Sequence, residues 1–226
     1  MILGIDSSAI TAGCALCDGG KIIAEEFLNT KHTHSQTLLP MVESMLKNAG
    51  AALADVEKIA VTAGPGSFTG LRIGIAAVKG MAMGAGKPVV GVSTLEAIAY
   101  NFTSFEGIVC ACMDARCNQV YNALFRVRNG VVERMCDDRA LRLEQLSEEL
   151  SALDGKIILA GDGAELTDSF SEQRYTLAPY PLRYQRGSGV CYAAADKQPI
   201  DAAALMPSYL RLPQAERERL AKQANG

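Results

Sequence analysis

Short blocks of apolar residues follow one another along the first part of the chain, and the spacing within each block predicts one secondary-structure element. The opening ILGIDSS is a strand that runs into a polar turn at Asp6. TAGCALCDGGKIIAEE contains two strands joined by a hairpin turn at residues 18–20. HSQTLLPMVESMLKNAG has apolar residues at helical spacing, and KIAVTA is a further strand. The predicted order is therefore strand, hairpin, helix, strand.

The second part of the chain repeats this order. IVCACMDAR is followed by QVYNALFRVRNGVVERM with a turn at residues 129–130, then by the helical pattern LRLEQLSEELSAL and the strand KIILAGDGAE. Asp114 ends the first strand of this copy as Asp6 does in the other. The spacings differ, so the architecture is repeated and the sequence is not. We therefore predict an α/β fold of two tandem RNase H-like βββαβ lobes, the architecture of actin, hexokinase and Hsp70.

This repeat sets the expected domain division. The first lobe should span residues 1–104 and the second residues 105–226. The C-terminal segment, about 205–226, is expected to pack back on the first lobe.

Composition narrows the class of protein. The 226 residues carry a net charge of −3, which gives no global attraction for nucleic acid. The longest apolar run, GIAAVKGMAMGAG, is interrupted by Lys79, and the N-terminus lacks the basic residues of a signal peptide. Seven cysteines, an odd number, indicate reduced thiols in a cytoplasmic protein. Cys14 and Cys17 should point to opposite faces of a strand, so we expect no dithiol there.

The stretch GPGSFTGLRIG at residues 64–74 does not match the known phosphate-binding loops. Gly64 and Gly70 are separated by five residues and no Gly-Lys-Ser/Thr follows, so it is not a Walker A loop. Ser67 or Thr69 could cap a helix beginning near Leu71, and free N–H groups there could bind an anion. The residues favour the alternative, a strand-to-helix turn whose hydroxyls satisfy the backbone.

Two helices carry more apolar surface than one sheet can cover. In the helix from 71 to 85, Leu71, Ile75, Val78 and Ala82 form one face, and glycines with other small or apolar residues form a second. Each glycine costs a helix about 1 kcal/mol relative to alanine, which suggests that another backbone approaches closely. We therefore predict a partner interface, with the other lobe as the alternative cover. The interface residues are Leu38, Leu39, Met41, Val42, Met45, Gly70, Gly74, Ala77 and Met81.

Other motifs predict structure rather than catalysis. Ser93 and Glu96 have the spacing of a capping box, which gives Glu96 a structural role. His32 and His34, the only histidines, have no third ligand nearby in sequence, so no metal site is expected. A G-x-S-x-G nucleophile motif is absent. We expect no catalytic residues.

Several of these stretches together resemble one family. GIDSS, HSQTLLPM, GPGSFTGLRIG, GVSTLEAIA, MDAR followed by VY, and PSYLR resemble the TsaB (YeaZ) family in the order expected for it, over most of the chain. The resemblance implies an actin-like ATPase (ASKHA) fold. It also implies an accessory subunit in bacterial synthesis of threonylcarbamoyladenosine at position 37 of ANN-decoding tRNAs. In that process the paralogue TsaD transfers the group, TsaE is an ATPase, and a separate enzyme supplies threonylcarbamoyl-AMP.

One departure from the paralogue carries weight. TsaD binds its metal through an H-x-x-x-H motif, and Thr94 and Ile98 occupy the corresponding positions here in an ungapped placement. Neither side chain can replace a histidine nitrogen as a metal ligand. The resemblance therefore implies a non-catalytic scaffold that pairs with TsaD through its first two helices and supports TsaE. Alone it should form a homodimer, and it should meet tRNA only through the complex.

The alternative reading is an enzyme of the same fold, a small ATPase or metabolite kinase that uses Asp6, Asp114 and the glycine-rich turns. A metallopeptidase is a third reading, which the missing histidines argue against. We expect no tightly bound cofactor, with ATP or ADP at an interface of the complex as a secondary expectation. The residues expected to contact nucleotide or anion are Asp6, Ser8, Gly66, Ser67 and Thr69.

Overall fold

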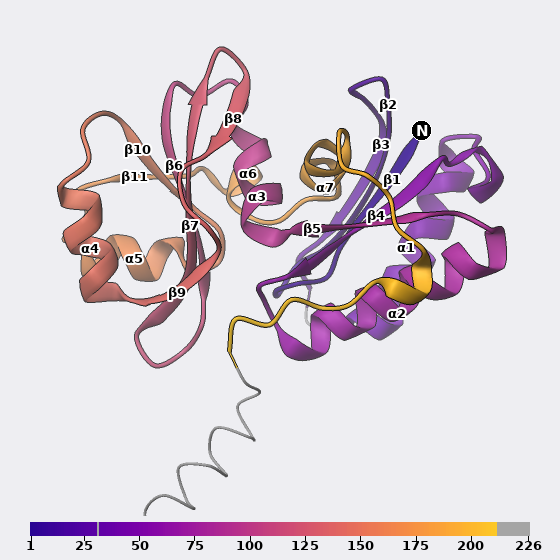
Figure 1. Ribbon diagram of the computed structural model, residues 1–226, viewed down its shortest axis with the longest axis horizontal. Coiled ribbons are helices and arrows are strands. Elements are labelled where there is room, and N and C mark those ends of the chain that lie inside the picture. Colours follow the sequence, from indigo (N-terminus) through magenta and orange to yellow (C-terminus); the bar gives the residue numbers. More distant parts are fainter. Residues whose placement is uncertain (31, 212–226) are drawn as a thin grey trace, which may run out of the picture.

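Two lobes lie side by side in the computed structural model, which describes residues 1–30 and 32–211 (Figure 1). The first lobe has a sheet of order β3-β2-β1-β4-β5, in which β1, β2 and β3 are antiparallel and β4 and β5 run parallel to β1. The strands are β1 (Ile2–Asp6), β2 (Ala12–Asp18), β3 (Lys21–Leu28), β4 (Lys58–Gly64) and β5 (Val89–Ser93). On one face lie α1 (His34–Asn48) and α2 (Phe68–Ala85), and on the other lies α7 (Gly187–Ala194).

The second lobe repeats this arrangement. Its sheet has the order β11-β10-β6-β7-β8, with β9 paired to β7 and β10 parallel to β6. The strands are β6 (Gly107–Asp114), β7 (Gln119–Arg128), β8 (Val131–Arg134), β9 (Arg139–Arg142), β10 (Ile157–Ala160) and β11 (Thr176–Leu177). The helices are α3 (Thr94–Ala99), α4 (Leu143–Ser151), α5 (Ala164–Phe170) and α6 (Tyr180–Arg183). Single helical turns are η1 (Leu53–Asp55), η2 (Tyr100–Phe102) and η3 (Ala202–Ala204).

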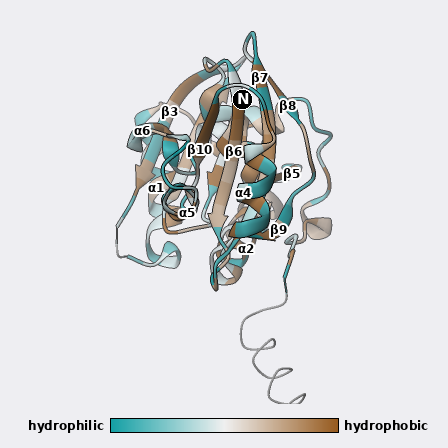
Figure 2. Cartoon of the chain, turned by 90° about the vertical axis from the view of Figure 1, so that its left-hand side faces the viewer, coloured by the Kyte–Doolittle hydropathy of each residue, from teal (hydrophilic) through white to brown (hydrophobic). Residues whose placement is uncertain are grey.

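These topologies confirm the predicted fold class. Each lobe contains three antiparallel strands, a helix and a parallel strand, in the order that the sequence predicts. Figure 2 shows brown, hydrophobic strands of the second sheet behind α4, whose outer side is largely teal. The predicted hairpin turns fall at residues 19–20 and 129–130, as expected.

The chain crosses between the lobes more than once. Each lobe therefore contains segments from both halves of the sequence. Leu95 and Ile98 of α3 are fully buried in the core beneath the second sheet, whereas Cys191 of α7 packs behind the first sheet. Lys58 of β4 joins the C-terminal end of α7 through bonds from its ammonium to the carbonyls of Ala194 and Ala195, both 2.8 Å. The division at residues 104 and 105 stays a prediction. Of the C-terminal segment, residues 212–226 lie outside the described residues.

Two local predictions can be compared directly with the structure. Cys14 and Cys17 belong to different clusters on opposite faces of β2, which confirms the predicted strand geometry. The second helix begins at Phe68, earlier than the predicted start near Leu71, and Ser67 is its cap, accepting from the Gly70 N–H at 3.2 Å.

Among the described residues, no helix combines the length and apolar character needed to cross a membrane.

Candidate functional site

The glycine-rich turn before α2 is packed against the turn that follows β1. The Ser67 N–H donates to the Ser8 carbonyl at 2.7 Å, and the Ser7 hydroxyl donates to the Gly70 carbonyl at 2.9 Å. A Cβ added to Gly66 would lie 2.4 Å from the Ser8 carbonyl oxygen, and one on Gly70 would lie 2.1 Å from that of Ser7. The glycines therefore let two backbones approach closely. Anion contact at Gly66, Ser67 and Thr69 stays a prediction.

Asp6 links the turn after β1 to β4 through hydrogen bonds. Its Oδ1 accepts from the hydroxyls of Ser8 and Thr62, both at 2.7 Å, and burial raises the pKa of the carboxyl above its usual value. The side chain is fully buried and does not line the cavity described next. Asp6 thus joins the ends of β1 and β4, and its contact with nucleotide or anion stays a prediction.

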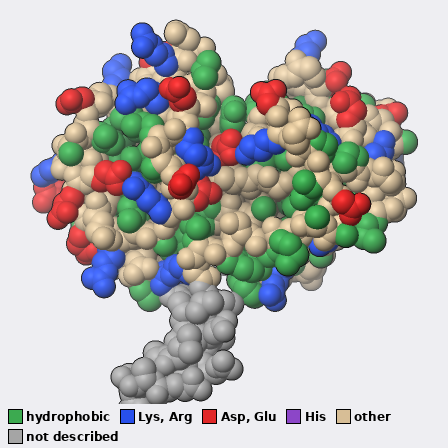
Figure 3. Space-filling model, in the orientation of Figure 1, with side chains coloured by type: hydrophobic (Ala, Val, Ile, Leu, Met, Phe, Trp, Pro, Cys, Tyr) green, Lys and Arg blue, Asp and Glu red, His purple; other side chains and the backbone are tan. Residues whose placement is uncertain are grey.

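A cavity of about 470 Å³ opens between the lobes. The first lobe, the second lobe and the segment beyond η3 all contribute to its wall. The lining residues are Ser8, Ala9, Ile10, Gly66, Ser67, Phe68, Met113, Asp114, Ala115, Arg116, Tyr121, Asp162, Ser208, Tyr209, Leu210 and Arg211. Figure 3 shows acidic and basic side chains close together along the junction of the lobes. Ser8, Gly66 and Ser67 are thus brought together at one wall, while Thr69 is exposed outside it.

The second-lobe wall of the cavity is acidic. Asp114 accepts from the Arg116 N–H at 2.7 Å and pairs with the Arg116 guanidinium at 3.3 Å. Burial, with smaller contributions from the charges of Asp114 and Asp6, raises the pKa of Asp162 to about 6. The sequence pattern identified Asp114 at the end of a strand but missed Asp162, although its place between Gly161 and Gly163 in a strand-to-helix turn matched the first-lobe turn.

The predicted interface on α1 and α2 needs correction. Leu38, Met41, Val42 and Met45 are at most 4% exposed because they fill the space between α1 and the first sheet. The prediction that these four face a partner is wrong. Helical spacing identifies an apolar face, but it does not say which face meets the chain's own sheet.

The two interface glycines also have partners within the chain. A Cβ on Gly74 would lie 2.4 Å from the Ser7 hydroxyl, and Gly70 is packed on the Ser7 carbonyl as described above. Ala77 and Met81 are partly buried against the first-lobe core. Of the nine predicted residues, only Leu39 is clearly exposed, at 50%.

A different row of α2 faces solvent. Met83 is 70% exposed, and Ala76 is exposed on the same side of the helix. A Cβ on Gly80 or Gly84 would meet no other atom within 4 Å. We call the exposed row of Ala76, Gly80, Met83 and Gly84 on α2 the outer face.

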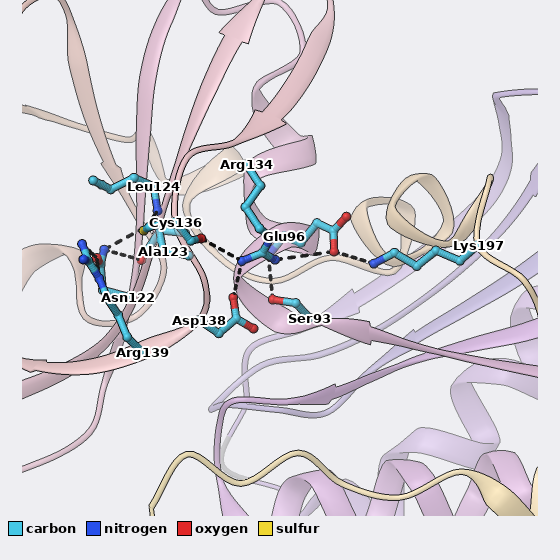
Figure 4. Close-up of polar contacts among 11 residues, drawn as sticks. Ser93, Glu96, Asn122, Ala123, Leu124, Arg134, Cys136, Asp138, Arg139 and Lys197 are labelled. Carbon is cyan, nitrogen blue, oxygen red and sulfur yellow. Dashed lines mark hydrogen bonds and ion pairs between the residues drawn. The ribbon is translucent and has the colours of Figure 1, made fainter.

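The start of α3 is closed to ligands. Thr94 and Ile98 are both fully buried, and among the described residues no group of three or more histidine, cysteine or acidic side chains could hold a metal ion. Ser93 caps the helix by accepting from the Glu96 N–H at 3.2 Å, as predicted. The Glu96 carboxylate, however, turns away and pairs with Lys197 at 2.5 Å and Arg134 at 3.6 Å (Figure 4).

Comparisons with known proteins find a TsaD family model, curated TsaB relatives and a YeaZ structure. The family model described as TsaD, tRNA N6-adenosine threonylcarbamoyltransferase, matches residues 21–181. The tRNA threonylcarbamoyladenosine biosynthesis protein TsaB of Bacillus subtilis (strain 168) is 34% identical over 95% of this chain and 96% of its own. TsaB of Escherichia coli (strain K12) is 37% identical over 72% of this chain and 71% of its own. The structure of YeaZ from Pseudomonas aeruginosa has a TM-score of 0.79 at 28% identity, covering 92% of this chain and 99% of that one.

Proposed function

Because the chain belongs to the TsaB (YeaZ) family, whose members are named for tRNA threonylcarbamoyladenosine biosynthesis, we propose that it is the non-catalytic scaffold subunit of that process. It pairs with the catalytic paralogue TsaD, supports the binding of TsaE, and meets tRNA through the assembled complex. In the absence of TsaD the same surface forms a homodimer. ATP or ADP, where bound, lies at an interface of this complex in the cytoplasm.

The outer face is the observation that carries the proposal. Gly80 and Gly84 lie inside a helix, where glycine costs about 1 kcal/mol relative to alanine, and neither has a packing partner in the described chain. Small residues at a helix surface let a second helix approach closely, and exposed Met83 beside them supplies apolar area. These features suit a helix of a related fold laid against α2.

The assignment of a scaffold role rests on α3. The resemblance places the metal-binding histidines of TsaD at Thr94 and Ile98, and both side chains are buried in the chain's own core. A hydroxyl and a hydrocarbon there supply no nitrogen ligand. The absence of a metal ligand at these two positions supports a scaffold role rather than the metal-dependent transfer step.

Reconstitution tests this role. The chain, TsaD, TsaE, threonylcarbamoyl-AMP and an ANN-decoding tRNA are combined, and each protein is omitted in turn. Modified adenosine should form with all three proteins and should be lost without TsaD or without this chain. Product formed by this chain alone would contradict the proposal.

A variant of the outer face tests the pairing. Met83→Glu places a charge where a partner helix would have to desolvate it, at a cost of several kcal/mol, roughly enough to abolish a micromolar association. Sedimentation should show a folded monomer that no longer binds TsaD, with a native circular dichroism spectrum. Val131→Glu, at a position 62% exposed on the second lobe, is the matched control and should still pair. A native-like Met83→Glu protein that still binds TsaD would refute the interface.

The alternative, a small ATPase or metabolite kinase, requires Asp6 to act on a ligand. Its carboxylate is held by Ser8 and Thr62 below the cavity. Rapid ATP hydrolysis by the pure chain, abolished by Asp6→Ala, would favour that alternative over the scaffold.

A further inference from the structure

The chain leaves η3 as an extended segment that runs alongside α2 toward the second lobe (Figure 1). Leu205 is 2% exposed in the first-lobe core, and the Ser208 N–H donates to the Ala63 carbonyl at 2.7 Å. A Cβ on Gly64 would lie 2.1 Å from the Ser208 carbonyl oxygen. Glycine at the end of β4 is therefore needed for this close approach. We call Ser208–Arg211 the strap.

Aromatic and cationic contacts fasten the strap to α2. The Tyr209 ring stacks on Phe68, with centroids 4.6 Å apart, and its hydroxyl accepts from Arg72 Nε at 3.1 Å. The Arg72 guanidinium lies 3.9 Å from the centroid of the Phe68 ring. These contacts hold the strap against the first two turns of the helix, so the strap belongs mechanically to the first lobe.

The end of the strap reaches the other lobe. Arg211 Nη1 donates to the Ala115 carbonyl at 2.7 Å, in the turn that follows β6. Among the described residues this is the one hydrogen bond between the strap and the second lobe. The strap is thus held at several points on one side of the cavity and at a single point on the other.

The opposite side of the junction is held differently. There α3 and α7 pack between the lobes, the chain crosses, and Glu96 pairs with Lys197 and Arg134 (Figure 4). At the cavity side the lobes meet through the Arg211 bond and through Ala9, which is partly buried against the second-lobe core. Packed helices at one side and these fewer contacts at the other are the arrangement of a hinge and a free edge. All four strap residues line the cavity along that free edge.

We propose that the strap is a latch that holds the two lobes together across the cavity and opens where Arg211 leaves the Ala115 carbonyl. Opening exposes the polar wall formed by Asp114, Asp162 and Tyr121 while the hinge stays intact. The proposal goes beyond the scaffold role, because it concerns the isolated chain and requires no partner.

Hydrogen exchange of the full chain tests the latch. Arg211→Ala removes the bond to the second lobe, so amides of residues 113–119 and 65–70 should exchange about tenfold faster, the factor expected from losing one charge-assisted bond. Arg211→Lys retains a cation and should give a smaller increase. Arg174→Ala removes an arginine that is 62% exposed elsewhere on the second lobe and should leave these amides unchanged.

A second variant separates latching from folding. Tyr209→Ala releases the strap from Phe68 and should accelerate exchange at the same amides and at 205–211, whereas Tyr209→Phe keeps the ring stack and should have little effect. Unchanged exchange at 113–119 in Arg211→Ala would overturn the proposal. Equal loss of protection throughout both sheets in Arg211→Ala and Tyr209→Ala would also overturn it, since the segment would then support folding rather than opening.

Discussion

Asp162 follows β10 in the wall of the cavity, where its Oδ1 has no hydrogen-bond partner among the described residues. Its pKa is raised to about 6, first by burial and then by the nearby charges of Asp114 and Asp6. Aspartates from both lobes therefore contribute to the raised pKa of Asp162. A raised pKa in an acid means that the folded protein holds this proton more tightly than the unfolded chain.

This difference predicts a pH dependence of stability. The contribution of Asp162 is fully present below its unfolded pKa of about 4 and is lost as the pH rises through about 6. Asp162→Asn cannot ionise, so at pH 7.5 it should be more stable than the parent protein by about 3 kcal/mol, at about 1.4 kcal/mol per pKa unit. Near pH 4 the two proteins should be equal. Urea unfolding at both values measures this.

The control for Asp162 is the exposed Asp154, whose substitution by asparagine should change stability little at either pH. A difference between Asp162→Asn and the parent that is the same at pH 4 and pH 7.5 would contradict an effect of ionisation.

In α2, glycines that look alike in the sequence have different surroundings in the structure. The helix contains glycines at 70, 74, 80 and 84. In the structure the first two admit the Ser7 backbone and hydroxyl, whereas the last two face open space. The glycines near the start of α2 thus allow close contact within the chain. Those near its end leave the helix backbone exposed.

Alanine at two of these positions should have opposite effects on stability. Gly70→Ala forces a Cβ to within 2.1 Å of the Ser7 carbonyl oxygen, so the backbones must separate, and unfolding should become easier by about 3 kcal/mol. Gly80→Ala meets nothing and should stabilise the isolated chain by up to about 1 kcal/mol. Urea midpoints of the two variants provide the comparison, and equal shifts in one direction would contradict the assignment.

For the whole molecule, the relation of the lobes depends on contacts between segments far apart in sequence. Glu96 of α3 pairs with Lys197, which follows α7, and with Arg134 of β8 (Figure 4). Arg134 also pairs with Asp138 at 2.6 Å. The Glu96 side chain is only 19% exposed, so its charge is partly shielded from water and its pairing is stronger than that of a surface pair.

Removing this charge should weaken the junction. Glu96→Gln leaves Lys197 without its anion and should destabilise the protein by about 1–2 kcal/mol in urea unfolding. Glu172→Gln breaks a pair with Arg174 whose side chains are 80% and 62% exposed, and it should cost less than about 0.5 kcal/mol. Comparable small losses in both variants would show that the Glu96 pairs do not stabilise the junction.

The sequence by itself determined the local elements and their order. Alternating and helical apolar spacing, the Asp-Gly-Gly turn at 18–20 and the Asn-Gly turn at 129–130 depend on neighbouring residues, so the pattern predicted both βββαβ units. It left the cap of α2 open between Ser67 and Thr69, and the structure has Ser67. Short sequence motifs, GPGSFTGLRIG among them, also carried the resemblance to the family. These features can be predicted from the sequence because backbone geometry and the periodicity of side chains are properties of short segments.

The tertiary structure decided what covers each apolar face of a helix. Both faces of α2 satisfied the helical period, and the chain itself covers both of them. One face buries Leu71, Ile75, Val78 and Ala82, and the other packs Gly70 and Gly74 against Ser7. The tertiary structure likewise brought Asp162 near Asp6, Glu96 to Lys197, and Arg211 to Ala115 across the junction. Such pairs join residues far apart in the chain, so their burial and charge arise only when the two lobes pack together.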